Sequence, residues 1–172
     1  MNYPTEFQEP ALILINHHTA PLFLPSKSPI PQGRIVTINK DNNVTLAQIG
    51  DCPFGITTSH ADDRTTFFEK DPYQIVVGGP IVDCYICMEL TLQEPHNGPY
   101  EAGMWLYVGK DGLLSKQTPT TGFKYPIAII INNLADTNGQ IECQPYSHTI
   151  PELHFLRIRY QSLFNIPPPQ MS

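Results

Sequence analysis

Long apolar runs and clustered positive charge are both missing from this sequence. Only 15% of the residues are charged, ten are Lys or Arg, and the formal net charge is −6. Binding to nucleic acid through phosphates needs clustered Lys and Arg, so we expect no nucleic-acid partner. No run of about 18 apolar residues occurs, which predicts no transmembrane helix and no membrane partner.

The signatures of several enzyme classes are also missing. The sequence has no G-x-S-x-G elbow, no H-E-x-x-H helix and no Walker loop. Catalysis needs an acid, base or nucleophile beside a partner group, and here the candidate side chains are scattered along the chain. We therefore expect a binding or structural protein and not an enzyme, with no catalytic residues, no cofactor and no metal.

Cysteine is scarce, with four residues at Cys52, Cys84, Cys87 and Cys143. Cys84 and Cys87 have the C-x-x-C spacing of zinc and redox sites, but no second close pair accompanies them. Residues three apart on a strand point to opposite faces, which prevents shared chelation. We favour buried free thiols in a reducing compartment. A metalloprotein or small-barrel enzyme built on this pair and the histidines is an alternative.

Proline, in contrast, is abundant, and its 18 residues lie mainly before residue 32, at the C-terminal end and beside turns. This distribution is typical of extended segments and not of helices. At 172 residues the chain is expected to form one domain with extensions. The pattern predicts an N-terminal arm (1–32), a β-rich body (33–146) and a C-terminal extension (147–172).

The body is organised around three expected hairpins. Residues 33–47 form the first, with a hydrophilic turn at Asn39–Asn43, and residues 101–114 form the second, with Gly109–Gly112 at its tip. Asp-Gly is a strong hairpin signal because glycine adopts positive φ without a Cβ penalty. A third pair joins Tyr125–Ile131 to Gln140–Tyr146.

Further short strands are expected between and after these hairpins. Tyr73–Val77 and Ile81–Leu90 are rich in β-branched and aromatic residues, residues 65–68 form a shorter strand, and His60–Arg64 is a polar loop. In residues 154–164 both a strand and a helical period fit, and we favour strand or irregular structure. Closely spaced short strands predict a mainly β fold, a small β-barrel or sandwich.

The N-terminal arm combines many prolines with large apolar residues. Residues 11–15 form a short strand candidate, and residues 21–25 are apolar and bracketed by prolines. Such a segment gains order by lying on another surface, either its own body or a partner. The candidate contact residues are Tyr3, Phe7, Leu12, Ile13, Leu14, Ile15, Leu22, Phe23 and Leu24.

Aromatic residues of the body support a second interpretation. Trp105 and Tyr107 share one face of an alternating strand, and Tyr100 lies nearby in sequence. Together they could form a stacking platform for a sugar or base. Burial in the core or in a contact between subunits is the competing explanation.

The order of glycines and strands in the body follows a recognisable pattern. It consists of Gly33–Ile38, Val44–Ala47, Pro53–Ile56, then Glu101–Tyr107 with Asp111–Leu114, and finally Tyr125–Ile129 with Gln140–Cys143. In this order residues 33–146 resemble bacteriophage capsid decoration (cement, or head-stabilising) proteins. Pro126 replaces the glycine of the closing pair in that family.

The resemblance implies a β-tulip or small-barrel body on the outer surface of a phage capsid, made in the host cytoplasm. Its partners would be the major capsid protein and itself, as a homotrimer at or near threefold axes. It would cement adjacent capsid subunits and stabilise the expanded head, with the nine contact residues above as capsid-binding candidates. A virion surface module that binds carbohydrate or a receptor is the alternative function.

Overall fold

The chain folds mainly into β-strands, which confirms the predicted fold class. The computed structural model describes residues 7, 10–17, 21–66, 68–133 and 154–162. Within them lie one short helix, α1 (Met88–Thr91), and two 3-10 turns, Asp63–Thr65 and Lys110–Gly112. The strands are β1 (Leu12–His17), β2 (Leu22–Ser26), β3 (Ile35–Ile38), β4 (Val44–Leu46), β5 (Gly55–Ile56), β6 (Tyr73–Val77), β7 (Ile81–Cys87), β8 (Trp105–Val108), β9 (Leu114–Ser115), β10 (Ala128–Asn133) and β11 (Phe155–Gln161).

The largest sheet has six antiparallel strands in the order β1-β7-β11-β10-β8-β9. Successive side chains on a strand point to opposite faces. In β11, Leu156, Ile158 and Tyr160 accordingly enter the core, whereas Arg157 is exposed. The strand expected within residues 154–164 is therefore present, and apolar burial on one face explains its alternating sequence.

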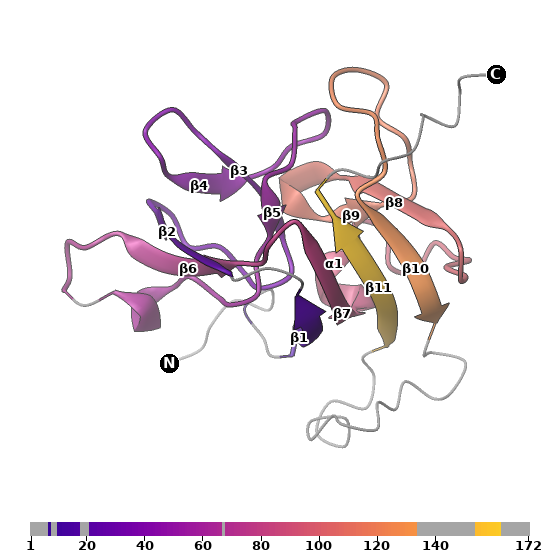
Figure 1. The fold of residues 1–172 in the computed structure, drawn as a ribbon, viewed down its shortest axis with the longest axis horizontal. Coiled ribbons are helices and arrows are strands. Elements are labelled where there is room, and N and C mark those ends of the chain that lie inside the picture. The colour runs from indigo at the N-terminus through magenta and orange to yellow at the C-terminus, as the bar shows by residue number, and fades with distance from the viewer. Residues whose placement is uncertain (1–6, 8–9, 18–20, 67, 134–153, 163–172) are drawn as a thin grey trace.

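Two smaller sheets pack beside the large one (Figure 1). One has the order β4-β3-β5, and the other pairs β2 with β6. A single bridge between Thr57 and Val77 connects them. Among the described residues none of the three sheets closes into a barrel, so the mainly β prediction holds without closure.

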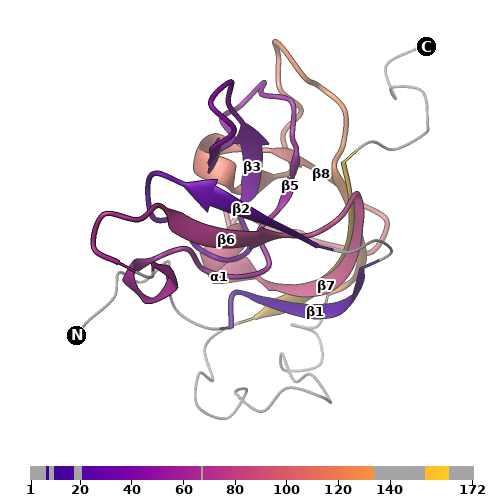
Figure 2. The same cartoon turned by 60° about the vertical axis from the view of Figure 1, so that its left-hand side comes forward.

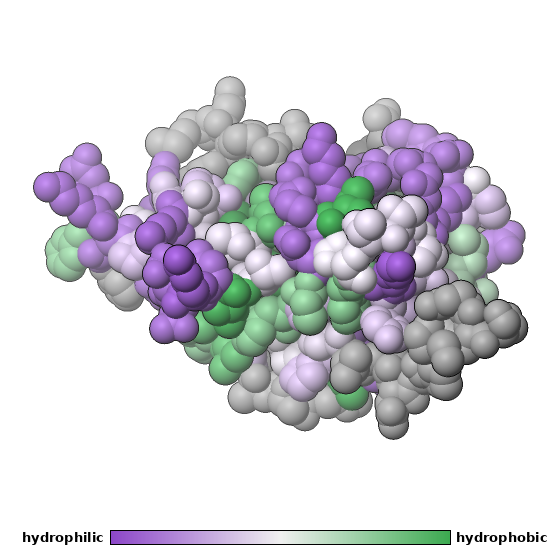
Figure 3. Space-filling model, turned by 90° about the horizontal axis from the view of Figure 1, so that it is seen from above, coloured by the Kyte–Doolittle hydropathy of each residue, from purple (hydrophilic) through white to green (hydrophobic). Residues whose placement is uncertain are grey.

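Strand β3 contributes side chains to two hydrophobic clusters. Ile35 belongs to the main core against the six-stranded sheet, and the adjacent Val36 packs in a second cluster with Ile75 and Val77 of β6. Because neighbouring side chains on a strand point to opposite sides, β3 packs against the main core on one side and against the cluster with Ile75 and Val77 on the other. On the face seen from above, hydrophobic residues lie between groups of hydrophilic residues (Figure 3).

Both segments expected to be arms contribute strands to the body. β1 pairs with β7, and β2 pairs with β6 (Figure 2). β11 lies between β7 and β10 (Figure 1). The division at residues 32 and 146 therefore does not separate the strands of the arms from those of the body. The apolar segments of the arm gain their order on the chain's own sheets, one of the two possibilities that their composition predicted.

The third expected hairpin differs from the structure. β10 is paired on one side with β8 and on the other with β11, and both pairings include Ala128 and Ile129. The expected partner, residues 140–146, lies outside the described residues. The strand beside β10 is supplied by residues 155–161.

The first two hairpins are confirmed. Asn39 N–H donates to the Asn43 carbonyl in the turn between β3 and β4. At the tip of the β8–β9 hairpin, Asp111 and Gly112 have φ values of 53° and 74°. A Cβ at Gly112 would lie 2.6 Å from the Ile35 carbonyl oxygen, so glycine is required there for space as well as for backbone conformation. The strand expected at residues 65–68 is wrong, since a 3-10 turn ends at Thr65.

Candidate functional site

The exposed apolar residues of β1 and β2 form the candidate site. Leu14 and Ile15 on β1 are 41% and 40% exposed, and Leu22 and Phe23 on β2 are 47% and 74% exposed. We call these four residues together the β1–β2 face, a name for the exposed apolar side chains on both sides of the two strands, since the neighbours Leu22 and Phe23 point to opposite sides of β2. Each belongs to the set of nine contact residues that the sequence predicts.

The other predicted contact residues have different environments. Leu12 is buried in the main core, and Ile13 and Leu24 are half-buried against neighbouring clusters. The half-buried ring of Phe7 lies 5.7 Å from the His60 ring. Tyr3 lies outside the described residues. These contacts make Leu12, Ile13, Leu24 and Phe7 parts of the chain's own packing.

Both strands of the face lie at the edge of their sheets as described. β1 begins the six-stranded order, and β2 is one of only two strands in its sheet. Neither strand carries a charged residue, although charges are a common protection of sheet edges. Apolar edge strands of this kind are suited to contact with another protein surface.

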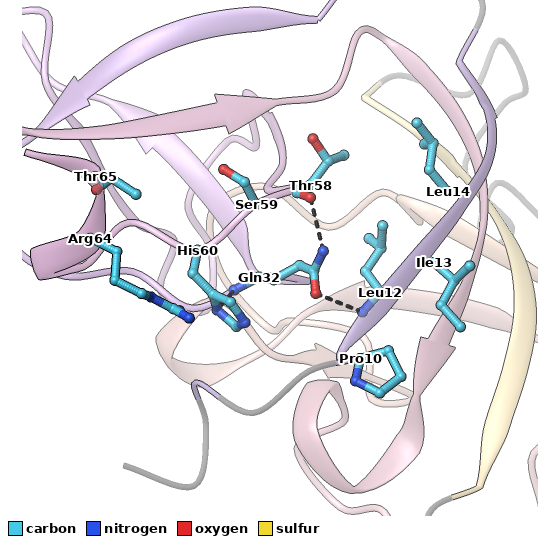
Figure 4. A pocket seen from close by; sticks show the side chains of 10 residues that line it. All are labelled: Pro10, Leu12, Ile13, Leu14, Gln32, Thr58, Ser59, His60, Arg64 and Thr65. Carbon is cyan, nitrogen blue, oxygen red and sulfur yellow. Dashed lines mark hydrogen bonds between the residues drawn. The ribbon is translucent and has the colours of Figure 1, made fainter. Parts of the chain in front are cut away.

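A hollow of about 500 Å³ separates β1 from the segment 58–65. Figure 4 shows Leu12, Ile13 and Leu14 on one side of it and Ser59, His60 and Arg64 on the other. A second hollow, of about 370 Å³, borders the same segment and is lined by Phe23 and Val76 on its other side. Segment 59–65 therefore lies between the β1 part and the β2 part of the face.

Gln32 connects the two sides of the first hollow. Its side-chain oxygen accepts the backbone N–H groups of Ala11 and Leu12, each at 3.3 Å. Its side-chain nitrogen donates to the Thr58 carbonyl at 2.9 Å, and its backbone N–H donates to His60 Nδ1 at 2.9 Å. The beginning of β1 is thus attached through one glutamine to the segment that carries His60.

Asp62 and Arg64 organise the turn beyond His60. The Asp62 carboxylate accepts the backbone N–H of Arg64, and it forms a bidentate pair with the guanidinium group. Burial raises the pKa of Asp62, but the hydrogen bonds and charge of Arg64 outweigh burial and hold the pKa below its usual value. The nearly buried carboxylate is therefore a structural anion that caps the 3-10 turn.

The burial of this segment was not predicted. Residues 60–64 were expected to form a polar loop, but His60 and Asp62 are buried. A signal is present in the spacing of Asp62 and Thr65, which form a reciprocal capping box. That motif predicts a helical turn with a fixed acidic side chain, and it excludes a freely solvated loop.

The aromatic residues proposed as a stacking platform are not exposed together. Tyr100 and Tyr107 are buried, and Trp105 is half-buried. The Tyr100 hydroxyl donates to the Glu94 carbonyl at 2.7 Å, and Lys116 Nζ lies 4.8 Å above the ring. These residues fix the loop that precedes β8, so they do not offer a flat aromatic surface to a sugar.

The two cysteines of the C-x-x-C pair lie on opposite faces of β7 and are buried. Cys84 packs in the main core, and Cys87 packs in a separate cluster with Ala11 and Phe155. Burial, reinforced by Asp83, raises the pKa of the Cys84 thiol, and burial with Glu89 raises the pKa of Cys87 to about 12. The expectation of buried thiols is confirmed for this pair.

The remaining cysteines and possible metal ligands add no site in the described part of the chain. Cys52 is exposed, contrary to the expectation of burial, and Cys143 lies outside the described residues. No group of three or more His, Cys, Asp or Glu side chains with metal-binding geometry occurs where side chains are described. None of the helices in that part is long and apolar enough to cross a bilayer.

Comparison with known proteins identifies no family for this chain. No protein-family model matches the chain, and no curated protein matches it. The β1–β2 face and the hollows beside it are therefore interpreted from their own geometry.

Proposed function

We propose that this protein is a structural protein that binds another protein through the β1–β2 face. The observation that carries the proposal is the exposure of four large apolar residues on two uncharged edge strands. Desolvation of such residues supplies contact energy at a protein interface, and edge strands offer backbone hydrogen-bonding groups as well.

The partner we propose is the major capsid protein of a bacteriophage. Support for this choice comes from the resemblance of residues 33–146 to capsid decoration proteins, together with the mainly β body. The protein would lie on the outer capsid surface of the virion after synthesis in the host cytoplasm. There it would join adjacent capsid subunits, as a homotrimer at or near threefold axes.

The mechanism is repeated binding without chemistry. Each contact through Leu14, Ile15, Leu22 and Phe23 can be modest, because many copies on one shell act together. A protein that binds the expanded lattice more tightly than the precursor stabilises the expanded state by that difference in affinity.

The test uses co-sedimentation with expanded capsids of the protein's own phage. A truncation of residues 1–32 is unsuitable, because it would remove β1 and β2 and so expose their partners β7 and β6. The variant Phe23→Ser in the full-length chain keeps the strand and removes the aromatic ring of the face, which is 74% exposed. Ile49→Ser is the matched control, since Ile49 is 53% exposed outside the face.

We expect wild type and Ile49→Ser to pellet with capsids, and Phe23→Ser to bind at least about tenfold more weakly. Thermal unfolding should be similar for all three proteins, because both substitutions are at exposed positions. Equal binding by Phe23→Ser and wild type would refute the role of the face. Failure of the wild-type protein to pellet would refute the capsid as partner.

A further inference from the structure

The hydrogen bond between Gln32 and His60 fixes the protonation state of a buried histidine. Gln32 donates through its backbone N–H to His60 Nδ1 over 2.9 Å. A backbone amide can only donate, so Nδ1 must be the unprotonated nitrogen of a neutral ring. His60 is only 5% exposed, which means that water does not readily replace this acceptor if it is lost.

The consequence of losing this acceptor extends to β1. Gln32 is the residue whose side chain accepts the N–H groups of Ala11 and Leu12 and donates to the Thr58 carbonyl. If the Gln32 backbone moves away from a protonated His60, its side chain cannot keep all of these partners. The beginning of β1 then loses an attachment that its pairing with β7 does not provide.

We propose that this junction is a pH-sensitive latch, in which proton uptake at His60 Nδ1 releases Gln32 and loosens the beginning of β1. The latch is a property of the isolated protein and does not depend on the function proposed above. Where that function operates, the latch would change the presentation of Leu14 and Ile15, the β1 part of the face, as the pH falls.

The groups around His60 determine how readily it takes up a proton. Among the described residues, the Asp62 carboxylate interacts electrostatically with His60, and Arg64 lines the same hollow while paired with Asp62. Asp62 favours the charged ring, and Arg64 opposes it by neutralising part of that carboxylate. Phe7, whose ring lies 5.7 Å from the His60 ring, and Gln32, which donates to Nδ1, carry no titratable group. Protonation of Nδ1 requires loss of the hydrogen bond from Gln32.

The test measures amide hydrogen-exchange protection factors by NMR at about pH 7.5 and about pH 5, the interval in which histidine ordinarily changes charge. In wild type we expect the protection of the Leu12 amide to fall at least about tenfold at the lower pH, as for loss of one buried hydrogen bond. The amide of Leu106 on β8, outside the latch, should keep its protection and serves as the internal reference.

Two variants separate His60 from other titrating groups. In His60→Asn the side-chain oxygen can accept the Gln32 N–H without titrating, so Leu12 should stay protected at both pH values. In His60→Leu the acceptor is missing, so protection of Leu12 should be low at both. An unchanged wild-type protection factor, or an equal fall in His60→Asn, would overturn the proposal.

A measurement on wild type alone keeps the test decisive if a variant fails to fold. The ring resonances of His60 and the amide shift of Leu12 are followed in one pH titration. The latch requires a common midpoint for both signals. Different midpoints, or a ring that titrates while the Leu12 amide does not respond, would overturn the proposal.

Discussion

The substitution Ile158→Ala tests whether β11 is a central strand of the body. Ile158 is fully buried, and it pairs with Cys84 of β7 on one side and Ile130 of β10 on the other. All three side chains belong to the main core. If residues 147–172 were only an extension on the surface, truncation of this side chain would have little effect.

The expected magnitude follows from the buried side chain. Removal of three carbon atoms at about 0.8 kcal/mol each gives about 2.4 kcal/mol of lost transfer free energy. The cavity left between two fixed neighbouring strands adds to this, so the total should lie between about 2.4 and about 5 kcal/mol. For a chain of this size each kcal/mol corresponds to a fall in Tm of about 2–4 °C.

Urea unfolding followed by circular dichroism measures this change in the free energy of unfolding. Arg157→Ala is the matched control, because the neighbouring residue on the same strand is exposed. The control should stay within about 0.5 kcal/mol of wild type. A loss below about 1 kcal/mol for Ile158→Ala would refute the central position of β11.

Three further predictions concern backbone space, thiol reactivity and pH. Gly112→Ala should lower the free energy of unfolding by about 2 kcal/mol or more, because the positive φ and the nearby Ile35 carbonyl both oppose a Cβ. A loss under about 0.5 kcal/mol would contradict this prediction. Iodoacetamide with peptide mapping at about pH 8 should label the exposed Cys52, whereas Cys84 and Cys87 should react only in urea. Asp62 has a lowered pKa in the folded state, so its ionised form stabilises the fold above the unfolded-state pKa of about 3.9, and this contribution is lost as the pH falls through the folded-state pKa. Asp62→Asn should therefore lower the free energy of unfolding, measured in urea at pH 7, by about 1 kcal/mol, because the exposed Arg64 side of the ion pair limits the effect. The difference in free energy between wild type and the variant should shrink below about pH 4. A difference that stays constant with pH would contradict a stabilising role of the ionised Asp62.

Local signals in the sequence predicted the local structure well. The Asn39–Asn43 turn and the Asp111-Gly112 tip both specify hairpins through backbone conformation, which depends on a few neighbouring residues. The alternation in residues 155–161 favoured strand or irregular structure over the helical period that also fits, and the structure has a strand with one face buried. These features need no information from distant parts of the chain.

Pairings between distant segments were not predicted. β1 and β7 are separated by more than sixty residues, and β11 joins β7 across a similar distance, so no turn type sets their register. Residues 125–131 were accordingly expected to pair with the nearest apolar segment, and the outer strands were expected to be arms. Contacts of this kind are decided by which segments best fill the core.

The candidate site was predicted in part for the same reason. Composition identified the apolar residues of β1 and β2, but it could not distinguish the exposed Leu14 from the buried Leu12 two positions earlier. Both residues lie in the regularly paired part of β1, opposite Ile86 and Cys84 of β7, so the difference depends on which distant segments pack over each of them. The link from Gln32 to His60 also depends on packing between segments that are 28 residues apart.

The position of β11 has a consequence for synthesis on the ribosome. The strands β1 and β7 lie on one side of it, and β10, β8 and β9 lie on the other, so within the large sheet only the last described strand joins the two groups. Until residue 161 leaves the exit tunnel, β7 and β10 each present an unpaired edge to other nascent chains. A chain that terminates early would lack the strand that joins these groups. Productive folding of the large sheet is therefore postponed until β11 has been synthesised, and products that terminate before β11 should be prone to aggregation.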